Sequence, residues 1–208
     1  MLIERTLRYL GWRGALDEPM RQLLDSCAQE VRTLRPSFAH ARFSLSHDPL
    51  RLSEAGIVLP SAQLDRSFRM CDACEVVGIT LGAEAERLVR YYALIDMARM
   101  SVLDAMLSAW VEECCDESER QIITETRTAR LCPGYGDIPL ALNEPLGAAL
   151  SLPRIGLYVK AGGALSPQKS MIGLIGIGDV GQPKSCGSCI RSNDCEYRKR
   201  GERCYASD

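Results

Sequence analysis

The spacing of hydrophobic and polar residues predicts several strands along the chain. Residues 39–46 alternate apolar and polar side chains, which is typical of a half-buried strand. Residues 75–81 are rich in Val, Ile and Thr and predict a buried strand. Residues 154–160 and 171–178 predict two more strands, separated by a turn at Gly162-Gly163.

Longer segments show the spacing of amphipathic helices. Residues 2–10, 17–34 and 61–70 each predict a helix, and apolar residues recur every three to four positions from 83 to 118. This last segment is interrupted near residues 94–97, so we expect two helices there. Helices and strands together predict an α+β fold, in which an antiparallel or mixed sheet packs against helices.

The chain divides into a core and a short appendage. Residues 1–182 carry the periodic apolar pattern and are expected to form one domain, with Gly and Pro frequent after Cys132. Residues 183–208 have no such pattern and contain four of the ten cysteines. We therefore expect a short, cysteine-rich, metal-binding tail after the core.

Charge and hydropathy exclude several classes of protein. Lys and Arg number 25 and Asp and Glu number 27, which gives a net charge of −2 and argues against a dedicated nucleic-acid binder. No uncharged stretch approaches the roughly 18 residues of a membrane-spanning helix, and no signal peptide is visible. We expect a cytoplasmic protein whose thiols stay reduced and which has no membrane partner.

Three other features are interpreted as structural. Residues 176–181 match GxGxxG, but Pro183 follows and no helix opens, so we expect these glycines to end a strand rather than bind a dinucleotide. Cys71 and Cys74 lack the context of a redox CxxC motif and are expected to pack in the core. The acidic run from Glu112 to Glu119 is expected to be a solvated helix face.

The tail has the spacing of a metal site. Its cysteines form the pattern C-x2-C-x5-C-x8-C, at Cys186, Cys189, Cys195 and Cys204. Four thiolates complete a tetrahedral set that suits zinc or an iron–sulfur cluster. Zinc ribbons usually have two C-x2-C pairs and this tail has one, so we favour the cluster. A structural zinc and four free thiols are the alternatives.

The segment from Arg130 to Leu140 is the most distinctive in the core. Pro133 fixes its backbone, and Gly134 and Gly136 allow conformations that other residues rarely adopt, with Tyr135 between them. Such a loop can bring backbone groups close to a ligand. Arg130 can supply a fork for a carboxylate. The alternative interpretation is a tight turn with a packed Tyr.

This segment resembles the Arg-x-x-Pro-Gly-Tyr signature of the reactivation domain of cobalamin-dependent methionine synthase. Residues 165–174 look like that domain's second signature, Pro-x-x-Ser-x-x-Gly, and residues 79–82 with the following long helix look like its free-standing members. The resemblance covers roughly residues 4–178. One departure is clear. After Gly-Tyr the family continues Pro-Ala-Cys-Pro, whereas here Tyr135 is followed by Gly136, Asp137, Ile138 and Pro139.

The resemblance implies a module that binds S-adenosylmethionine, whose methyl group re-alkylates a cobalamin inactivated as Co(II), after one-electron reduction. It implies that Arg130 holds the methionyl carboxylate and that the backbone at Cys132 and Gly134 contacts the ligand. It also implies that Tyr135 lies at the cobalamin face. Tyr135 is thus the candidate catalytic residue as well as a candidate cofactor-binding residue.

We therefore expect an accessory protein that reactivates a corrinoid methyltransferase, such as a methionine synthase without its own reactivation domain. The partner carries the cobalamin. The tail cluster, or a ferredoxin or flavodoxin, would supply the electron. The alternative is a regulatory module that binds S-adenosylmethionine and has a structural zinc tail.

Overall fold

The protein is built around an antiparallel sheet. The computed structural model describes residues 2–178, 196–199 and 201. Strands β3, β2, β1, β4 and β7 lie in this order, each antiparallel to its neighbour, and β5 and β6 pair separately. The strands are β1 Ser37–Ser46, β2 Arg51–Leu52, β3 Ile57–Val58, β4 Cys71–Thr80, β5 Tyr158–Val159, β6 Leu165–Ser166 and β7 Ser170–Gly178. The predicted α+β class is confirmed, with an antiparallel sheet.

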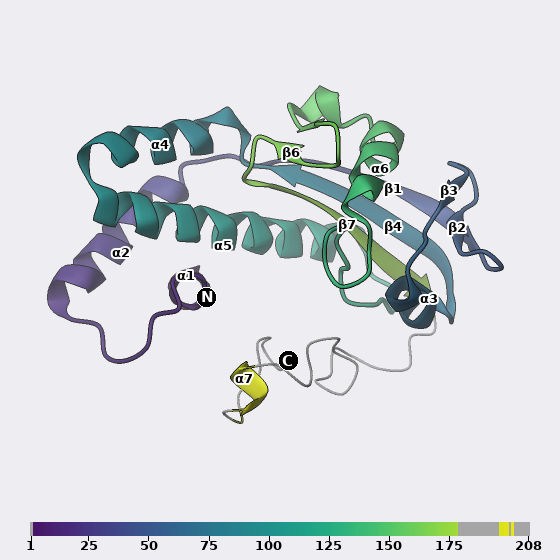
Figure 1. The fold of residues 1–208 in the computed structure, drawn as a ribbon, viewed down its shortest axis with the longest axis horizontal. Coiled ribbons are helices and arrows are strands. Elements are labelled where there is room, and N and C mark those ends of the chain that lie inside the picture. The colour runs from purple at the N-terminus through teal and green to yellow at the C-terminus, as the bar shows by residue number, and fades with distance from the viewer. Residues whose placement is uncertain (1, 179–195, 200, 202–208) are drawn as a thin grey trace.

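Helices pack on both faces of this sheet. In Figure 1, α1, α2, α4 and α5 gather on the left, α6 lies above the sheet and α3 lies at the lower right. The helices are α1 Leu2–Tyr9, α2 Glu18–Val31, α3 Ala62–Phe68, α4 Gly82–Ile95, α5 Met97–Ile122, α6 Asn143–Ala149 and α7 Glu196–Lys199, with short 3-10 turns at η1 Leu140–Leu142 and η2 Leu152–Ile155.

Alternation along the central strands creates two hydrophobic cores. On β4, Val77 and Ile79 face the core that α1, α2 and α5 complete. Cys74 and Val76 face the opposite core, to which α3 and α6 contribute. Because β4 is covered on both faces, residues 74–80 are all buried, and all of them except Glu75 and Thr80 are nonpolar. Cys71 and Cys74 are buried here, as expected for packing residues.

The interruption predicted near residues 94–97 is a sharp corner between α4 and α5. The Asp96 side chain accepts a hydrogen bond of 2.9 Å from the backbone N–H of Arg99, which caps the start of α5. The Asp96 N–H donates to the carbonyl of Tyr92 at 2.8 Å, which closes α4. One aspartate thus ends one helix and begins the next.

Two strand predictions need correction. Residues 154–160 are not a strand: η2 occupies Leu152–Ile155, and only Tyr158–Val159 pair as β5. Gly156 has a left-handed φ of 74°, which breaks the extended backbone that the apolar pattern favours. The strand predicted over 75–81 starts earlier, at Cys71, because pairing with β7 continues to Gly178 across a β-bulge.

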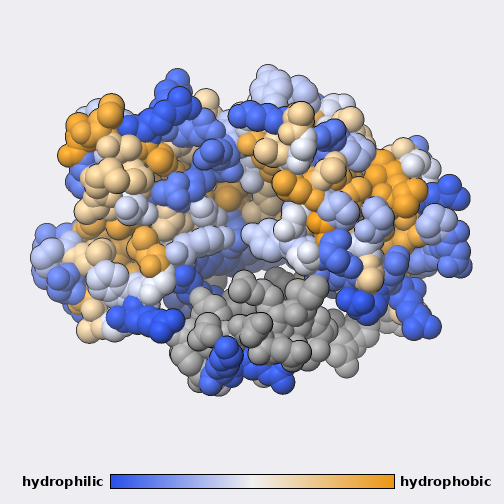
Figure 2. Space-filling model, viewed as in Figure 1, coloured by the Kyte–Doolittle hydropathy of each residue, from blue (hydrophilic) through white to orange (hydrophobic). Residues whose placement is uncertain are grey.

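The corner between α4 and α5 leaves apolar side chains in contact with solvent. Tyr91, Leu94, Ile95 and Met97 are all exposed there, Leu94 by 86%. Apolar atoms gather at this end of the molecule on the left of Figure 2. The corner therefore contributes little to the core, although its residues continue the apolar spacing of the flanking helices.

Candidate functional site

The two signature segments lie side by side in the structure. After α5 the chain turns back and runs along β7, where Leu131 and Leu174 form an isolated antiparallel bridge. The N–H of each residue donates to the carbonyl of the other, at 2.9 Å from Leu131 and 2.8 Å from Leu174. Segments that are about 40 residues apart in sequence are thus joined by backbone hydrogen bonds.

Arg130 lies across the backbone of Gly173. A Cβ atom built at Gly173 would lie 2.5 Å from Cγ of Arg130 and closer still to Cδ. Real Cβ atoms do not approach neighbours so closely, so the arginine stem occupies the space that any larger residue at 173 would fill. Gly173 is the last residue of the Pro167-x-x-Ser170-x-x-Gly173 pattern, and this contact gives it a physical role.

The guanidinium of Arg130 binds two carboxylates of α5. One nitrogen donates to Glu119 and another donates to Asp116 at 3.0 Å, and only 12% of the arginine side chain is exposed. Burial acts to lower the pKa of Arg130, but the negative groups around it, including Glu119 and Asp116, raise it above its ordinary value. The fork predicted to receive a ligand carboxylate is therefore already paired within the chain.

Asp116 is shared between two arginines. It accepts a hydrogen bond of 2.7 Å from Arg5 of α1 as well as the bond from Arg130. Burial acts to raise the pKa of Asp116, but the hydrogen bond from Arg5 and the charges of both arginines bring it below its ordinary value. The prediction that the acidic run is a solvated face is wrong for Asp116 and Glu119. They turn toward the arginines because α1 and the loop of residues 130–140 (the 130s loop) cover this side of α5.

The loop beyond Arg130 has the unusual backbone that its glycines predict. Gly134 and Gly136 have φ values of 89° and 61°. The Gly134 N–H donates to the Ile138 carbonyl at 2.9 Å, and the Tyr135 N–H donates to the Cys132 carbonyl at 3.2 Å. The Gly134 N–H and the Cys132 carbonyl thus already take part in the loop's own hydrogen bonds.

Tyr135 projects from this loop into solvent. Its side chain is 70% exposed, so the alternative of a packed Tyr is wrong. Partial burial, and then the neighbouring Cys132 and Glu112, raise the pKa of Tyr135 above its ordinary value. The side chain is therefore a neutral phenol at physiological pH, which can stack or donate a hydrogen bond but cannot act as a base.

A second tyrosine stands beside it. The Tyr9 hydroxyl donates to a carboxylate oxygen of Glu112 at 2.5 Å. Burial, this hydrogen bond and the charge of Glu112 raise the pKa of Tyr9, and Tyr135 adds to the effect. Tyr9, Glu112 and Tyr135 are thus close enough to one another for their charges to interact.

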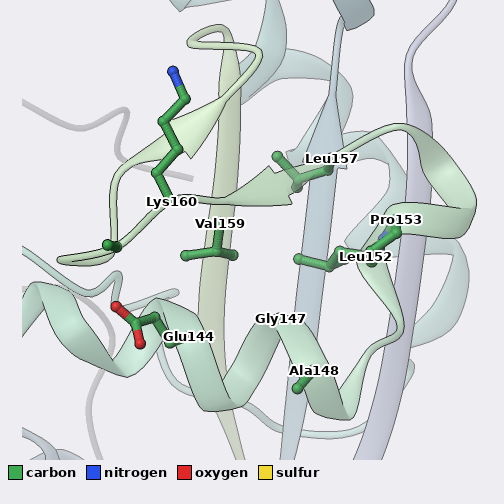
Figure 3. Close-up of a pocket in the computed structure, with 9 residues that line it drawn as sticks. Glu144, Gly147, Ala148, Leu152, Pro153, Leu157, Val159 and Lys160 are labelled. Atoms are coloured by element: carbon green, nitrogen blue, oxygen red, sulfur yellow. The ribbon is translucent and has the colours of Figure 1, made fainter.

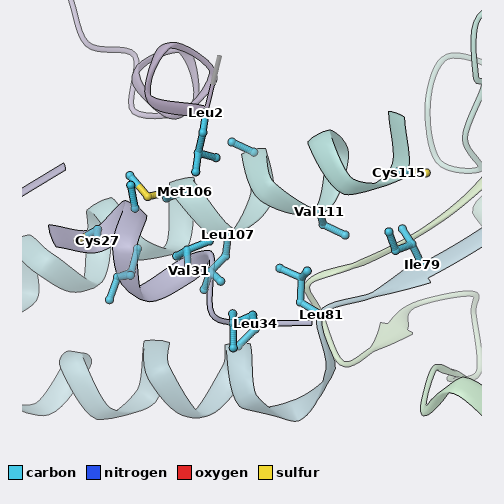
Figure 4. Packing of buried hydrophobic residues seen from close by; sticks show 14 of the residues in the cluster. Leu2, Cys27, Val31, Leu34, Ile79, Leu81, Met106, Leu107, Val111 and Cys115 are labelled. Carbon is cyan, nitrogen blue, oxygen red and sulfur yellow. The ribbon is translucent and has the colours of Figure 1, made fainter. Parts of the chain in front are cut away.

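The thiols around Arg130 are protonated at neutral pH. Burial raises the pKa of Cys132 to about 11, and it also raises the pKa of Cys115. Cys115 lies on α5, near the strands, at one end of the buried cluster in Figure 4. Its Sγ is 3.4 Å from Oε1 of Glu119. Neither thiol is a ready nucleophile at neutral pH.

The third segment of the resemblance is joined to the second. Ser170 donates from its hydroxyl to Thr80 Oγ1 at 2.7 Å, and the Leu81 N–H donates to the Lys169 carbonyl at 3.0 Å. The Gly82 N–H donates to Thr80 Oγ1 at 3.0 Å, where α4 begins. The three segments of the resemblance are therefore connected through β4 and β7.

A small cavity lies elsewhere, between α6, η2 and β5. Its volume is about 300 Å³, and its lining residues are Glu144, Gly147, Ala148, Leu152, Pro153, Leu157, Val159, Lys160 and Ala161. Val159 points toward Gly147 of α6, where a Cβ atom would lie 2.7 Å from it (Figure 3). The cavity contains none of the residues predicted from the sequence.

The predicted metal site belongs to the cysteine-rich tail. Cys186, Cys189, Cys195 and Cys204 all lie outside the described residues. Within residues 2–178, 196–199 and 201, no group of three or more His, Cys, Asp and Glu side chains is arranged to hold a metal ion.

Among the same residues, none of the helices is both long enough and apolar enough to span a bilayer.

Sequence reasoning missed Arg5, Asp116 and Glu119, which complete the surroundings of Arg130. The acidic run on α5 was a usable signal, because a buried arginine needs carboxylate partners and this run is the densest group of acids in the chain. No sequence feature indicated that α1 would cover it. That contact depends on tertiary packing between α1 and α5.

Comparison with known proteins identifies the fold. No family model matches the chain, and no curated protein matches it. Among solved structures, the chain is similar to one described as the crystal structure of the MetH reactivation domain bound to AdoHcy. The TM-score is 0.66 and the sequence identity 12%, over 96% of this chain and 83% of that one. The chain thus has the fold of the MetH reactivation domain.

Proposed function

We propose that the protein binds S-adenosylmethionine and reactivates a cobalamin-dependent methyltransferase that carries the cobalamin. The observation that carries the proposal is the contact of Arg130 with Gly173, which joins the two signature segments in one place. The shared fold supports it, since the MetH reactivation domain was crystallised with AdoHcy, the product left when S-adenosylmethionine gives up its methyl group.

The charges around Arg130 suit the amino-acid end of this ligand. That end is a zwitterion, with a carboxylate and an ammonium group on one carbon. Arg130 has N–H donors for the carboxylate, while Asp116 and Glu119 can accept from the ammonium group. Ligand binding would then exchange part of the internal ion pair for contacts to the ligand.

Tyr135 is the candidate contact to the partner's cobalamin. It is exposed, it is neutral, and it lies on a loop that begins at Arg130. In the proposed reaction one electron reduces Co(II) to Co(I). Co(I) then takes the methyl group of S-adenosylmethionine, which leaves AdoHcy and methylcobalamin. The chain would hold the methyl donor and present an aromatic surface to the corrin, and the cobalamin supplies the redox chemistry.

The electron requires a source outside residues 2–178. We include in the proposal that the tail cysteines hold an iron–sulfur cluster, with zinc as the alternative. A ferredoxin or flavodoxin would be the donor of the electron. Lys and Arg residues surround the four cysteines in sequence, and positive charge favours thiolates as ligands.

Two measurements test the proposal. Calorimetry of the full chain with S-adenosylmethionine and with AdoHcy should show saturable binding of both. An anaerobic assay with a cobalamin-binding methyltransferase in the Co(II) state, a low-potential reductant and S-adenosylmethionine should then form methylcobalamin faster when the protein is present. Folded protein that binds neither ligand would refute the proposal. Binding without faster methylcobalamin formation would favour the regulatory alternative.

A further inference from the structure

The loop that carries Tyr135 is attached to α3 by a residue where the chain departs from the family pattern. One carboxylate oxygen of Asp137 accepts a hydrogen bond of 2.7 Å from the hydroxyl of Ser61. The backbone N–H of Gln63, in the first turn of α3, faces both carboxylate oxygens at 3.3 Å. A single side chain thus joins the loop to the start of a helix far away in sequence.

The attachment point on α3 is rigid. Ser61 is the N-cap of this helix, and its hydroxyl oxygen also accepts from the Leu64 N–H at 3.1 Å. Leu64 and Phe68 are fully buried in the core on this face of the sheet. The ring of Phe68 lies against Gly176 of β7, where a Cβ atom would be 2.7 Å from it. Helix α3 and strand β7 therefore form one packed unit.

The loop is fixed to this unit at both ends. Leu131 pairs with Leu174 at the first end, and Asp137 binds the start of α3 at the second. Ile138, the residue after Asp137, is buried and so holds this end of the loop against the core. An apolar contact has no preferred direction, however, so it does not fix the orientation of the loop. The hydrogen bonds of Asp137 are directional, so they fix the rotation of the residues between the two ends.

The hydrogen bonds among those residues lie within the loop itself and do not attach it to the rest of the fold. Gly134 and Gly136 both have left-handed φ values, and glycine gives the backbone its widest freedom when it is not held. Tyr135 between them is mostly exposed. The hydrogen bond from Ser61 holds the pKa of Asp137 below its ordinary value, so the carboxylate is charged and able to accept at neutral pH.

We propose that Asp137 is a positioning residue for Tyr135: its carboxylate holds the loop against the start of α3 and so fixes the tyrosine in the orientation that the partner's cobalamin meets. The part about cobalamin rests on the proposed function. The part about the loop concerns the free protein alone. Asp137 itself faces α3 and would contact neither the methyl donor nor the corrin.

The test compares Asp137→Ala, Asp137→Asn and Asp65→Ala. Asp65 is an exposed acid in the first turn of α3, so Asp65→Ala removes a negative charge near the same helix start and leaves the loop contact in place. Amide hydrogen exchange is measured at Tyr135 and Ile138, whose N–H groups donate to carbonyls within the loop. The ligand-free protein is used, and folding is checked by circular dichroism.

We expect Asp137→Ala to speed exchange at both amides by about tenfold or more, because a charge-assisted attachment is lost. Asp137→Asn keeps one acceptor oxygen and should fall between Asp137→Ala and the wild type, while Asp65→Ala should match the wild type. If Asp137→Ala does not fold, the test is whether the two amides exchange faster in Asp137→Asn than in Asp65→Ala. Unchanged exchange, or equal changes in the Asp65 control, would overturn the attachment.

Two further readouts separate this inference from the proposed function. Affinity for S-adenosylmethionine should stay within about twofold in Asp137→Ala, whereas methylcobalamin formation should slow by about tenfold. If the wild type binds no S-adenosylmethionine, the proposed function fails but the exchange result still stands. If the wild type is active and Asp137→Ala is equally active, the positioning role is refuted and the proposed function is unaffected.

Discussion

The stem of Arg130 occupies the space that a side chain at Gly173 would fill. The antiparallel bridge between Leu131 and Leu174 brings the two segments together. In this register Arg130 is opposite Ile175, so its long side chain reaches Gly173 diagonally across the bridge. The guanidinium is held in turn by Asp116 and Glu119, so the stem cannot move aside without breaking ion pairs. A glycine in one signature is therefore required by an arginine in the other.

Gly173→Ala should weaken both the fold and the site. The new Cβ would overlap the arginine stem, and overpacking of this kind costs about 1–3 kcal/mol. Because the displaced residue is Arg130, we also expect a lower affinity for S-adenosylmethionine. Chemical denaturation and calorimetry measure the two effects.

Gly147→Ala is the matched control for this substitution. Its Cβ would lie 2.7 Å from Val159, so it should also destabilise the protein, but away from Arg130. It should leave the affinity unchanged. Equal loss of affinity in both variants would mean that Gly173 acts only through general stability.

Arg130→Ala should reduce the affinity for S-adenosylmethionine roughly ten- to hundredfold, as expected for a lost charge-assisted contact to a carboxylate. It should also lower the free energy of unfolding by about 3–5 kcal/mol, because Glu119 is left buried without its partner. Arg154→Ala, on an exposed arginine, is the control. Calorimetry of folded Arg130→Ala that gives wild-type affinity would remove Arg130 from the ligand site.

Local sequence signals were sufficient for the elements near the site. The alternating pattern at residues 39–46 and the apolar run at 75–81 both became central strands, and the interruption near 94–97 became the capped corner at Asp96. The signature loop has the left-handed glycines that its composition predicts. Each of these features depends on residues close together in sequence.

The surroundings of Arg130 depend on contacts that no local pattern contains. Glu119 and Asp116 looked like solvated acids because their helix ends in a run of charges, yet α1 and the 130s loop cover them. The predicted strand over 154–160 failed for the opposite reason. There the local apolar pattern was overridden by one left-handed residue, Gly156.

The Asp116 ion pair predicts a pH dependence of stability. The folded-state pKa of Asp116 lies below the ordinary value of 3.8, so its stabilising effect is fully present above that pH and is lost as pH falls through the lower, folded-state value. Denaturation of the wild type and of Asp116→Asn at several pH values should show two curves that converge in acid. A constant difference down to pH 2 would contradict the pairing with Arg5 and Arg130.

Tyr135→Phe should separate ligand binding from methyl transfer. The side chain is exposed and lies at the surface rather than between Arg130 and its carboxylates, so affinity for S-adenosylmethionine should be nearly unchanged. Loss of the hydroxyl should slow remethylation of the partner's cobalamin. An affinity loss as large as that of Arg130→Ala would instead place Tyr135 in the ligand pocket.

The tail cysteines should bind one metal centre as a unit. Removing one of four thiolates leaves an open, labile position, so Cys186→Ser, or the same change at Cys189, Cys195 or Cys204, should lose or greatly loosen the metal. Cys27→Ser and Cys114→Ser are the controls, because neither thiol belongs to the tail. Metal analysis after anaerobic purification measures the result. A brown protein that bleaches on reduction would indicate an iron–sulfur cluster, and a colourless one with zinc would leave the tail a structural element.

Deleting the tail after residue 182 should leave a folded core. In the part of the chain that the structure describes, both hydrophobic clusters are made of residues within 2–178, so we expect them to form without the tail. The truncated protein should keep the melting behaviour of the core and its affinity for S-adenosylmethionine, because Arg130, Gly173 and their carboxylate partners are all retained. It should fail to support reductive methylation when electrons come from a ferredoxin or flavodoxin. Full activity of the truncated protein with such a donor would exclude the tail from electron delivery, whichever metal it holds.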